Sequence, residues 1–125
     1  MIFGVGTDIV EVARVEAALA EFGDAFAKRI LHEKELAEFE ASHIKPRFLA
    51  KRFAAKEAFS KAIGTGIRGA VSFQNIRVTH DDMGKPLLEL SAEIQALMQE
   101  KNISATHVSV SDEKNLAAAF VVLEV

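Results

Sequence analysis

Two acidic residues stand in surroundings that are unusual for a carboxylate. Asp8 interrupts an apolar segment, with Gly4 and Gly6 on its own side of an expected strand. Glu57 is the only acid among seven bases between Lys45 and Arg68. A carboxylate in a partly buried strand is costly unless it is paired or binds a metal. If the two meet, they suit Mg²⁺, which takes one or two protein carboxylates together with water and phosphate oxygens.

Simpler interpretations of both acids remain open, because spacing alone does not show that they meet. Asp8 can form a salt bridge to a helix arginine, and Glu57 can pair with Lys61 one helical turn later. If the acids do meet, three neighbouring bases are available to hold the remaining charge of a phosphate ligand: Arg52, Lys56 and Lys61.

Charge is distributed unevenly along the chain. The segment from Lys45 to Arg68 carries a net charge of +6, whereas the whole chain carries −3, so the remainder carries −9. A basic surface on an acidic protein suggests an anionic ligand or partner, although a solvated helix face would look the same. Nucleic acid is disfavoured, because the phenylalanines of this segment have the spacing of a helical core.

The glycine-rich segment Gly64–Gly69 spells G-x-G-x-x-G, but it follows an expected helix and precedes an expected strand. A dinucleotide-binding loop needs the opposite order, so that interpretation fails. Gly64 then either caps the helix or begins a wall where backbone can approach a ligand closely. The alternating segment His107–Ser111 has no acid at triad-like spacing, and the four histidines form no zinc pattern.

Hydrophobic periodicity predicts the elements that must position these residues. We expect a single α+β domain (1–125) with a largely antiparallel sheet wrapped around or packed on a long central helix. An alanine ridge at every fourth position of that helix would let another element approach closely. The predicted strands are Ile2–Val10, Ser72–His80, Leu87–Leu90, and a hairpin of Thr106–Ser111 with Leu116–Val125. The predicted helices are Glu11–Phe22, a short one through Phe26 and Leu31, His32–Ser42, Arg47–Ile63 and Ser91–Lys101.

Composition limits the class of protein. The chain has 125 residues, half of them hydrophobic, which is enough for one domain with a core. It has no cysteine, which excludes thiolate chemistry and is consistent with a reducing, cytoplasmic location. The longest apolar run, Leu116–Leu123, is too short to span a bilayer. Met1–Gly6 lacks a basic leader, so we expect no secretion signal and no membrane association.

Four motifs in order resemble the holo-[acyl-carrier-protein] synthases, the small bacterial trimeric type of 4′-phosphopantetheinyl transferase. They are Gly4–Glu11 followed by Arg14, Arg52–Ala62 followed by Gly64–Ile67, Gly84–Pro86, and His107–Ser111. The resemblance runs along the whole chain. One departure is Asp112, which stands where some members have a second histidine.

The resemblance implies transfer of 4′-phosphopantetheine from coenzyme A to a serine of apo acyl carrier protein, in fatty acid biosynthesis, with release of adenosine 3′,5′-bisphosphate. Asp8 and Glu57 match the Mg²⁺ ligands, and Lys61 matches a phosphate-binding, catalytic lysine. Three residues fall where the family contacts the nucleotide end of coenzyme A: Lys85, Pro86 and His107. We expect Arg52 and Gly64 to add to the coenzyme site. The family's trimers hold the coenzyme between subunits.

The resemblance leaves the proton acceptor open between two glutamates. Glu57 would act directly, whereas Glu35 would act through water and is suggested only by its approximate position in the family. An acidic carrier protein would dock on the basic side chains of Arg14, Lys45, Arg47 and Lys51. Two alternatives remain: a non-catalytic module that binds coenzyme A or another nucleotide, and a structural protein that recruits acidic partners through the basic helix.

Overall fold

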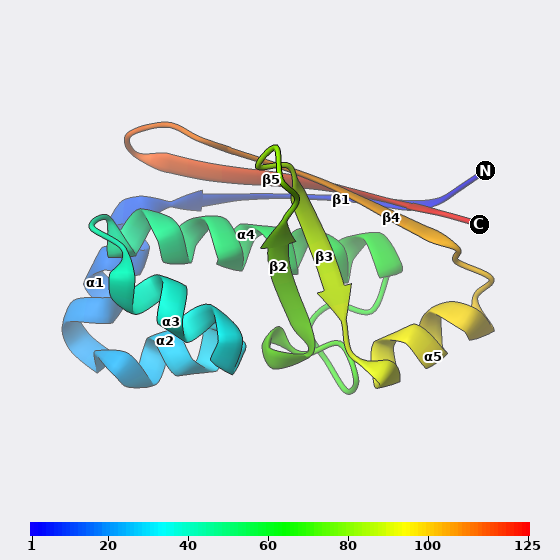
Figure 1. Cartoon of the computed structure of the whole chain (residues 1–125), viewed down its shortest axis with the longest axis horizontal. Helices are drawn as coiled ribbons and strands as arrows, with labels where there is room; N and C mark the ends of the chain where they lie inside the picture. The colour runs from blue at the N-terminus through cyan, green and yellow to red at the C-terminus, as the bar shows by residue number, and fades with distance from the viewer.

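Helix α4 (Lys45–Ile63) lies at the centre of the fold, with a β-sheet on one side and the smaller elements on the other (Figure 1). The structure is a computed structural model that describes residues 1–125. The other helices are α1 (Val12–Phe22), α2 (Asp24–Ile30), α3 (Glu33–Ala41), the 3₁₀ helix η1 (Phe73–Asn75) and α5 (Ala92–Glu100). The strands are β1 (Ile2–Glu11), β2 (Ile76–His80), β3 (Pro86–Leu90), β4 (Ala105–Asp112) and β5 (Leu116–Glu124).

The strands form two separate antiparallel sheets. The larger has the order β1-β5-β4, so the first strand of the chain pairs with the last, and Asp8 lies opposite Ala119. The smaller is the hairpin β2-β3, which crosses in front of α4 in Figure 1. The predicted fold class, an α+β domain built on a long central helix, is therefore confirmed.

The sequence of α4 accounts for its length and its central position. Pro46 occupies the first helical turn, where its missing N–H costs nothing, and Gly64 ends the helix with a φ of 90°. Leu49 and Phe59 are fully buried, as are all four alanines between them. Because α4 is covered on several sides, it has little of the one-sided apolar pattern of a surface helix.

The close approach of β1 to α4 depends on two glycines. A Cβ added to Gly4 would overlap the carbonyl oxygen of Ala62, and one added to Gly6 would overlap that of Ala58. The alanine ridge predicted from sequence is therefore the surface against which β1 packs. This packing places the glycine-bearing face of β1, which also carries Asp8, directly over the helix.

The outer face of the three-stranded sheet is apolar and exposed. Its large side chains come from β1 and β5 and are Phe3, Val5, Ile9, Leu116 and Phe120. They lie on the side of the sheet that faces away from α4, because side chains alternate along a strand. We call these five residues the outer apolar face.

One predicted element begins later than expected. The strand predicted from Ser72 starts at Ile76, because Phe73–Asn75 forms the 3₁₀ helix η1. The Asn75 side chain donates to the Ala70 carbonyl oxygen (2.8 Å), and Phe73 stacks on Phe53 of α4 with ring centroids 5.5 Å apart. These tertiary contacts hold a turn where the local pattern indicates a strand. No helix in the fold is both long enough and apolar enough to cross a membrane.

Candidate active site

Asp8 and Glu57 lie close together, with Lys61 beside them. Asp8 faces α4 from β1, and Glu57 and Lys61 follow one another by one turn on the facing side of the helix. The Lys61 ammonium donates to Oδ1 of Asp8 and to the carbonyl oxygen of Thr7, both at 3.0 Å. The salt-bridge interpretation of Asp8 is therefore half right: its partner is a helix cation, but a lysine rather than an arginine.

The second oxygen of the Asp8 carboxylate has no partner. Oδ2 is buried and accepts no hydrogen bond, and the Asp8 side chain as a whole is only 15% exposed. A buried polar atom without a partner costs about 1 to 3 kcal/mol, so such atoms are rare in folded proteins. The lysine therefore satisfies only one side of the carboxylate, and the other side is free for an additional cation.

The electrostatic environment of Glu57 also indicates that a cation can bind between the two carboxylates. Burial and then the negative charge of Asp8 raise the pKa of Glu57, whereas the charge of Lys61 lowers it. No third acidic residue or histidine joins the two carboxylates. The donor set of two carboxylates fits a hard divalent ion that fills its remaining positions with water or ligand oxygens.

A cleft of about 360 Å³ opens beside Asp8. It lies between β1, α1, α2 and α4, and its walls include Arg14, Phe26 and Phe53. Asp8 itself lines the cleft, and Phe53 lies one turn before Glu57 on α4. Arg14, which the sequence predicted to dock an acidic partner, is exposed and lines this cleft.

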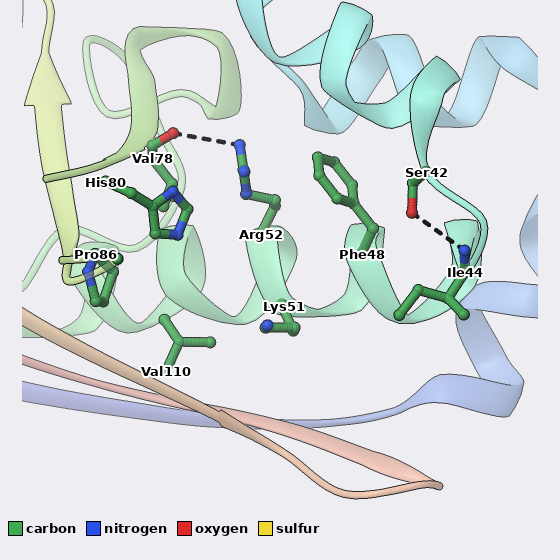
Figure 2. Close-up of a pocket in the computed structure, with 10 residues that line it drawn as sticks. Ser42, Ile44, Phe48, Lys51, Arg52, Val78, His80, Pro86 and Val110 are labelled. Carbon is green, nitrogen blue, oxygen red and sulfur yellow. Dashed lines mark hydrogen bonds between the residues drawn. The ribbon is translucent and has the colours of Figure 1, made fainter. Parts of the chain in front are cut away.

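A second pocket, of about 210 Å³, lies between α4, the β2-β3 hairpin and β4 (Figure 2). Its positive side chains are Lys51 and Arg52 of α4, and the hairpin adds His80 and Pro86. The remaining lining residues are Ser42, Ile44, Phe48, Val78, Gly84 and Val110. We call this the Arg52 pocket. No acidic side chain lines it, so it suits an anionic ligand.

Glu35 lies apart from Asp8, at the centre of a buried ionic network. One of its oxygens accepts from Lys56 (2.5 Å) and from the backbone N–H of His32 (2.9 Å). The other accepts from Arg52 and from the backbone N–H of Val78, both at 3.0 Å. Burial raises the pKa of Glu35, but the charge and hydrogen bond of Lys56 and the backbone hydrogen bonds of His32 and Val78 outweigh burial, so the pKa lies below the ordinary value.

Lys56 is not available to a phosphate ligand, which corrects the sequence interpretation. Its side chain is 0% exposed, and its ammonium donates to Glu35 and to the carbonyl oxygens of Ile30 (2.7 Å) and Phe73 (3.0 Å). All three N–H groups are used. Burial lowers the pKa of Lys56 to about 8, although the charge and hydrogen bond of Glu35 act in the opposite direction.

The other basic residues predicted to dock a partner are held by contacts within the chain. Arg47 and Lys51 both face Asp112, at 3.7 and 3.5 Å. The Lys45 ammonium donates to the carbonyl oxygens of Glu40 and Ser42, both at 3.2 Å, and so caps the C-terminal end of α3. Asp112, whose role the sequence left open, therefore joins the β4-β5 turn to α4.

The structure separates the residues predicted for the nucleotide end. Pro86 lines the Arg52 pocket, and Lys85 precedes it in the exposed turn. His107 lies on the exposed face of β4 and pairs with Glu124 at 2.5 Å. Gly64 caps α4, at the end of the helix that carries Lys61. Within one chain, then, Asp8, Glu57 and Lys61 form one cluster, and Arg52 and Pro86 belong to another.

Sequence reasoning missed His80 and Phe48 as lining residues of the Arg52 pocket. The register of the β2-β3 hairpin pairs His80 with Pro86. Treating the two predicted strands on either side of this turn as a hairpin would have placed these residues together. Phe48 lies one turn before Arg52, and its ring stacks 4.5 Å from the guanidinium carbon. Its helical spacing indicates only core packing, so the sequence holds no signal for this contact.

Comparison with known proteins decides the family. The profile of the 4′-phosphopantetheinyl transferase superfamily matches residues 4–121, which include the cluster around Asp8 and the Arg52 pocket. The chain belongs to this superfamily. The resemblance seen in the sequence, and the prediction that the chain is a phosphopantetheinyl transferase, are confirmed.

Individual members of the superfamily match along their full length. The holo-[acyl-carrier-protein] synthase of Vibrio cholerae is 54% identical over 124 residues, covering 99% of this chain and 98% of the relative. The crystal structure of the Neisseria meningitidis synthase superimposes with a TM-score of 0.96 at 51% identity, covering 99% of each chain. The crystal structure of a Bacillus anthracis synthase in complex with CoA (3′,5′-ADP) superimposes with a TM-score of 0.82 at 43% identity, covering 98% of this chain and 96% of that one.

Proposed function

We propose that this transferase moves 4′-phosphopantetheine from coenzyme A to a serine of apo acyl carrier protein, with Mg²⁺ held by Asp8 and Glu57, in fatty acid biosynthesis. The observation that carries the proposal is the buried, unpartnered Oδ2 of Asp8 beside Glu57 and Lys61. The name of the Vibrio cholerae relative and the ligand of the Bacillus anthracis structure support the substrates.

The metal would bind the two carboxylates that β1 and α4 bring together. Asp8 offers Oδ2, and Glu57 adds a second negative charge next to it. When bound, Mg²⁺ would neutralise charge on the diphosphate of coenzyme A and make its phosphorus a better electrophile. The protein supplies only two ligands, which leaves room for diphosphate oxygens and water.

Lys61 would act on both the protein and the substrate. Two of its three N–H groups fix its ammonium against Asp8 and the Thr7 carbonyl oxygen. The third is free, and the side chain is 51% exposed, so it can donate to a phosphate oxygen. A positioned cation of this kind stabilises the charge that develops in phosphoryl transfer.

The transfer exchanges one phosphorus–oxygen bond for another. The serine Oγ bonds to the phosphorus that carries pantetheine, and the bond from that phosphorus to the bridging oxygen breaks. The bridging oxygen leaves with adenosine 3′,5′-bisphosphate, and the serine proton passes to Glu57. We assign this proton to Glu57 rather than Glu35, because both oxygens of Glu35 are occupied by four donors and its side chain is 0% exposed.

Assembly into a homotrimer is supported by the outer apolar face. Exposed apolar side chains gathered on one side of a sheet typically mark a protein–protein interface. We propose that trimer contacts cover them, and that Lys85 and His107 serve the coenzyme site of a neighbouring chain. Such sharing would account for their separation from the Asp8 cluster within one chain.

The carrier protein would approach the cleft beside Asp8. Arg14 is an exposed cation at this cleft, whereas Lys45, Arg47 and Lys51 already have partners within the chain. We therefore propose Arg14 as the main contact with the acidic carrier, with the other three steering its approach. Steering of this kind weakens as salt rises.

Intact-mass spectrometry tests this function. Apo acyl carrier protein is incubated with the transferase and coenzyme A, with Mg²⁺ in one sample and a chelator in the other. We expect the carrier to gain one phosphopantetheine mass only in the sample with Mg²⁺. Binding of coenzyme A without any gain, across several carrier proteins, would instead indicate a non-catalytic binding module.

A further inference from the structure

The proposed reaction leaves the most deeply buried ionic group of the protein unused. Glu35 of α3 and Lys56 of α4 are both 0% exposed, and they form an ion pair at 2.5 Å. Burying an ion pair is expensive, and an apolar pair of similar volume is often as stable. The pair therefore needs a reason beyond stability, and that reason is found in the third member of the network, Arg52.

Arg52 reaches from the network into the Arg52 pocket. Its Nη1 atom donates to Glu35 (3.0 Å), to Glu38 (3.2 Å) and to the Val78 carbonyl oxygen (3.2 Å). Figure 2 shows the side chain rising from α4 towards Val78, beside the ring of Phe48. One nitrogen of the guanidinium is thus bound to three acceptors while the plane of the group rests on an aromatic ring.

The other two nitrogens of Arg52 remain available. Nε and Nη2 donate to no group of the chain, yet neither is among the buried atoms that lack a partner, so both keep contact with solvent. Arginine side chains bind phosphate most strongly through two parallel N–H groups. The Nε–Nη2 edge provides such a pair, in a pocket that no acidic side chain lines.

We propose that Glu35 is a positioning residue, which holds the guanidinium of Arg52 so that its free edge binds a phosphate group of coenzyme A in the Arg52 pocket. Lys56 keeps Glu35 ionised and fixed in place from the other side. The inference rests on the proposed function for the identity of the ligand. It gives Glu35 a role through Arg52, in place of the role in proton transfer that its position in the family suggests.

Glu38 provides a matched control, because it contacts the same nitrogen of Arg52 from a different environment. Its side chain is 47% exposed and makes no other hydrogen bond or ion pair, so this hydrated carboxylate adds little constraint to Arg52. Glu35 in contrast is fixed by four donors from three elements. Neutralising Glu38 removes one acceptor of Arg52 but should leave the guanidinium in place.

The first experiment compares Glu35→Gln and Glu38→Gln with the wild type. The dissociation constant of adenosine 3′,5′-bisphosphate is measured by calorimetry, and KM for coenzyme A and kcat are measured separately. For Glu35→Gln we expect the dissociation constant and KM to rise at least roughly ten-fold, with a smaller change in kcat. For Glu38→Gln we expect less than a three-fold change in each. Equal affinities of folded Glu35→Gln and wild type would overturn the proposal.

A second variant decides the question if Glu35→Gln fails to fold. Glu35→Asp keeps the charge that Lys56 requires, but its shorter side chain cannot reach all four donors at once. We expect it to fold and to show a several-fold loss of affinity for adenosine 3′,5′-bisphosphate. If Glu35→Asp folds and binds as tightly as the wild type, Glu35 does not position Arg52.

A double-mutant cycle separates positioning from a merely structural role. If Glu35 acts through Arg52, then Glu35→Asp should have no further effect on affinity in an Arg52→Met background. The same fold loss in both backgrounds would overturn the proposal. The binding measurement also separates the proposed transferase function from the proposed role of Glu35. If the wild type binds adenosine 3′,5′-bisphosphate but transfers nothing, the transferase function is refuted and the role of Glu35 is still tested. If the wild type does not bind it, the Arg52 pocket is refuted as the ligand site.

Discussion

Lys61 binds one oxygen of Asp8 at 3.0 Å and leaves the other buried without a partner. A structural salt bridge would be expected to satisfy both oxygens or to expose the second to water. Asp8 instead keeps an acceptor free at the point where Glu57 brings a second carboxylate. The pair of Asp8 and Lys61 therefore leaves one acceptor of Asp8 unused, as the proposed metal site requires.

Lys61→Met tests whether this lysine contributes to the reaction as well as to the salt bridge. Because its third N–H is free to stabilise developing charge, we expect the transfer rate to fall at least about 100-fold. Binding of Mn²⁺, measured by electron paramagnetic resonance, should persist because Asp8 and Glu57 remain. Lys34→Met, at an exposed position on α3 where the lysine side chain has no partner, serves as the control. An unchanged transfer rate in Lys61→Met would contradict the role assigned to it.

Gly6→Ala tests the close packing of β1 on α4. The added Cβ would overlap the Ala58 carbonyl oxygen, which is backbone and cannot move aside cheaply. We expect a loss of about 2 to 3 kcal/mol in the free energy of unfolding, measured by urea denaturation. Thr7→Ala changes the neighbouring residue on the exposed face of β1 and should cost far less. Equal stability of Gly6→Ala and the wild type would show that β1 lies farther from the helix.

The buried carboxylate of Glu35 predicts a loss of stability in acid. The pKa of Glu35 is lower in the folded protein than in the unfolded chain, so its stabilising effect is complete above about pH 4.5 and is lost as the pH falls further. The charged groups that face it are Lys56 and Arg52 from α4; β2 contributes only the backbone N–H of Val78. His32, which caps the start of α3, contributes its backbone N–H, and Glu38 of α3 accepts from the same nitrogen of Arg52 as Glu35 does.

The measurement compares the free energy of unfolding of the wild type and Glu35→Gln over a range of pH. At pH 7 we expect the variant to be less stable by about 3 to 5 kcal/mol, because Lys56 loses its buried partner. The difference should narrow as the pH falls below 4.5, because the unfolded wild-type chain then takes up a proton at Glu35 that the folded protein accepts only at lower pH. A difference that stays constant down to pH 3 would contradict the assigned ionisation of Glu35.

Ile9→Asp tests whether the outer apolar face is covered by further copies of the chain. Ile9 is 67% exposed, so a charge there should leave the fold of one chain intact. Light scattering after size-exclusion chromatography should give three chains per particle for the wild type and a smaller species for Ile9→Asp. A monomeric wild type would refute the proposed trimer.

Much of the fold follows from local sequence signals. The long helix is marked by Pro46 at its start, Gly64 at its end and alanines at every fourth position, and the structure has it over Lys45–Ile63. The strand Ile2–Glu11 is marked by alternation, and the alanine ridge of the helix predicted the close approach of a neighbouring element. These features depend on residues close in sequence, for which periodicity is informative.

The site was predicted less completely, because its contacts join residues far apart in the chain. Asp8 and Lys61 are separated by 53 positions and Glu35 and Lys56 by 21, and no spacing rule indicates such pairs. Lys56 was therefore expected on the phosphate, although it is buried with Glu35. The role of Arg52 in a pocket with His80 depends on how the β2-β3 hairpin crosses α4, which is a property of the tertiary fold.

The most direct test of the central claim is the transfer reaction of Asp8→Asn, followed by intact-mass spectrometry of the acyl carrier protein. The substitution keeps the size of the side chain but removes the charge that a divalent ion requires. Glu100→Gln, at the exposed end of α5, removes the same charge far from the site. We predict that Glu100→Gln and the wild type add phosphopantetheine in Mg²⁺, and that Asp8→Asn adds none. Mg²⁺-dependent transfer by Asp8→Asn at the wild-type rate would contradict the account.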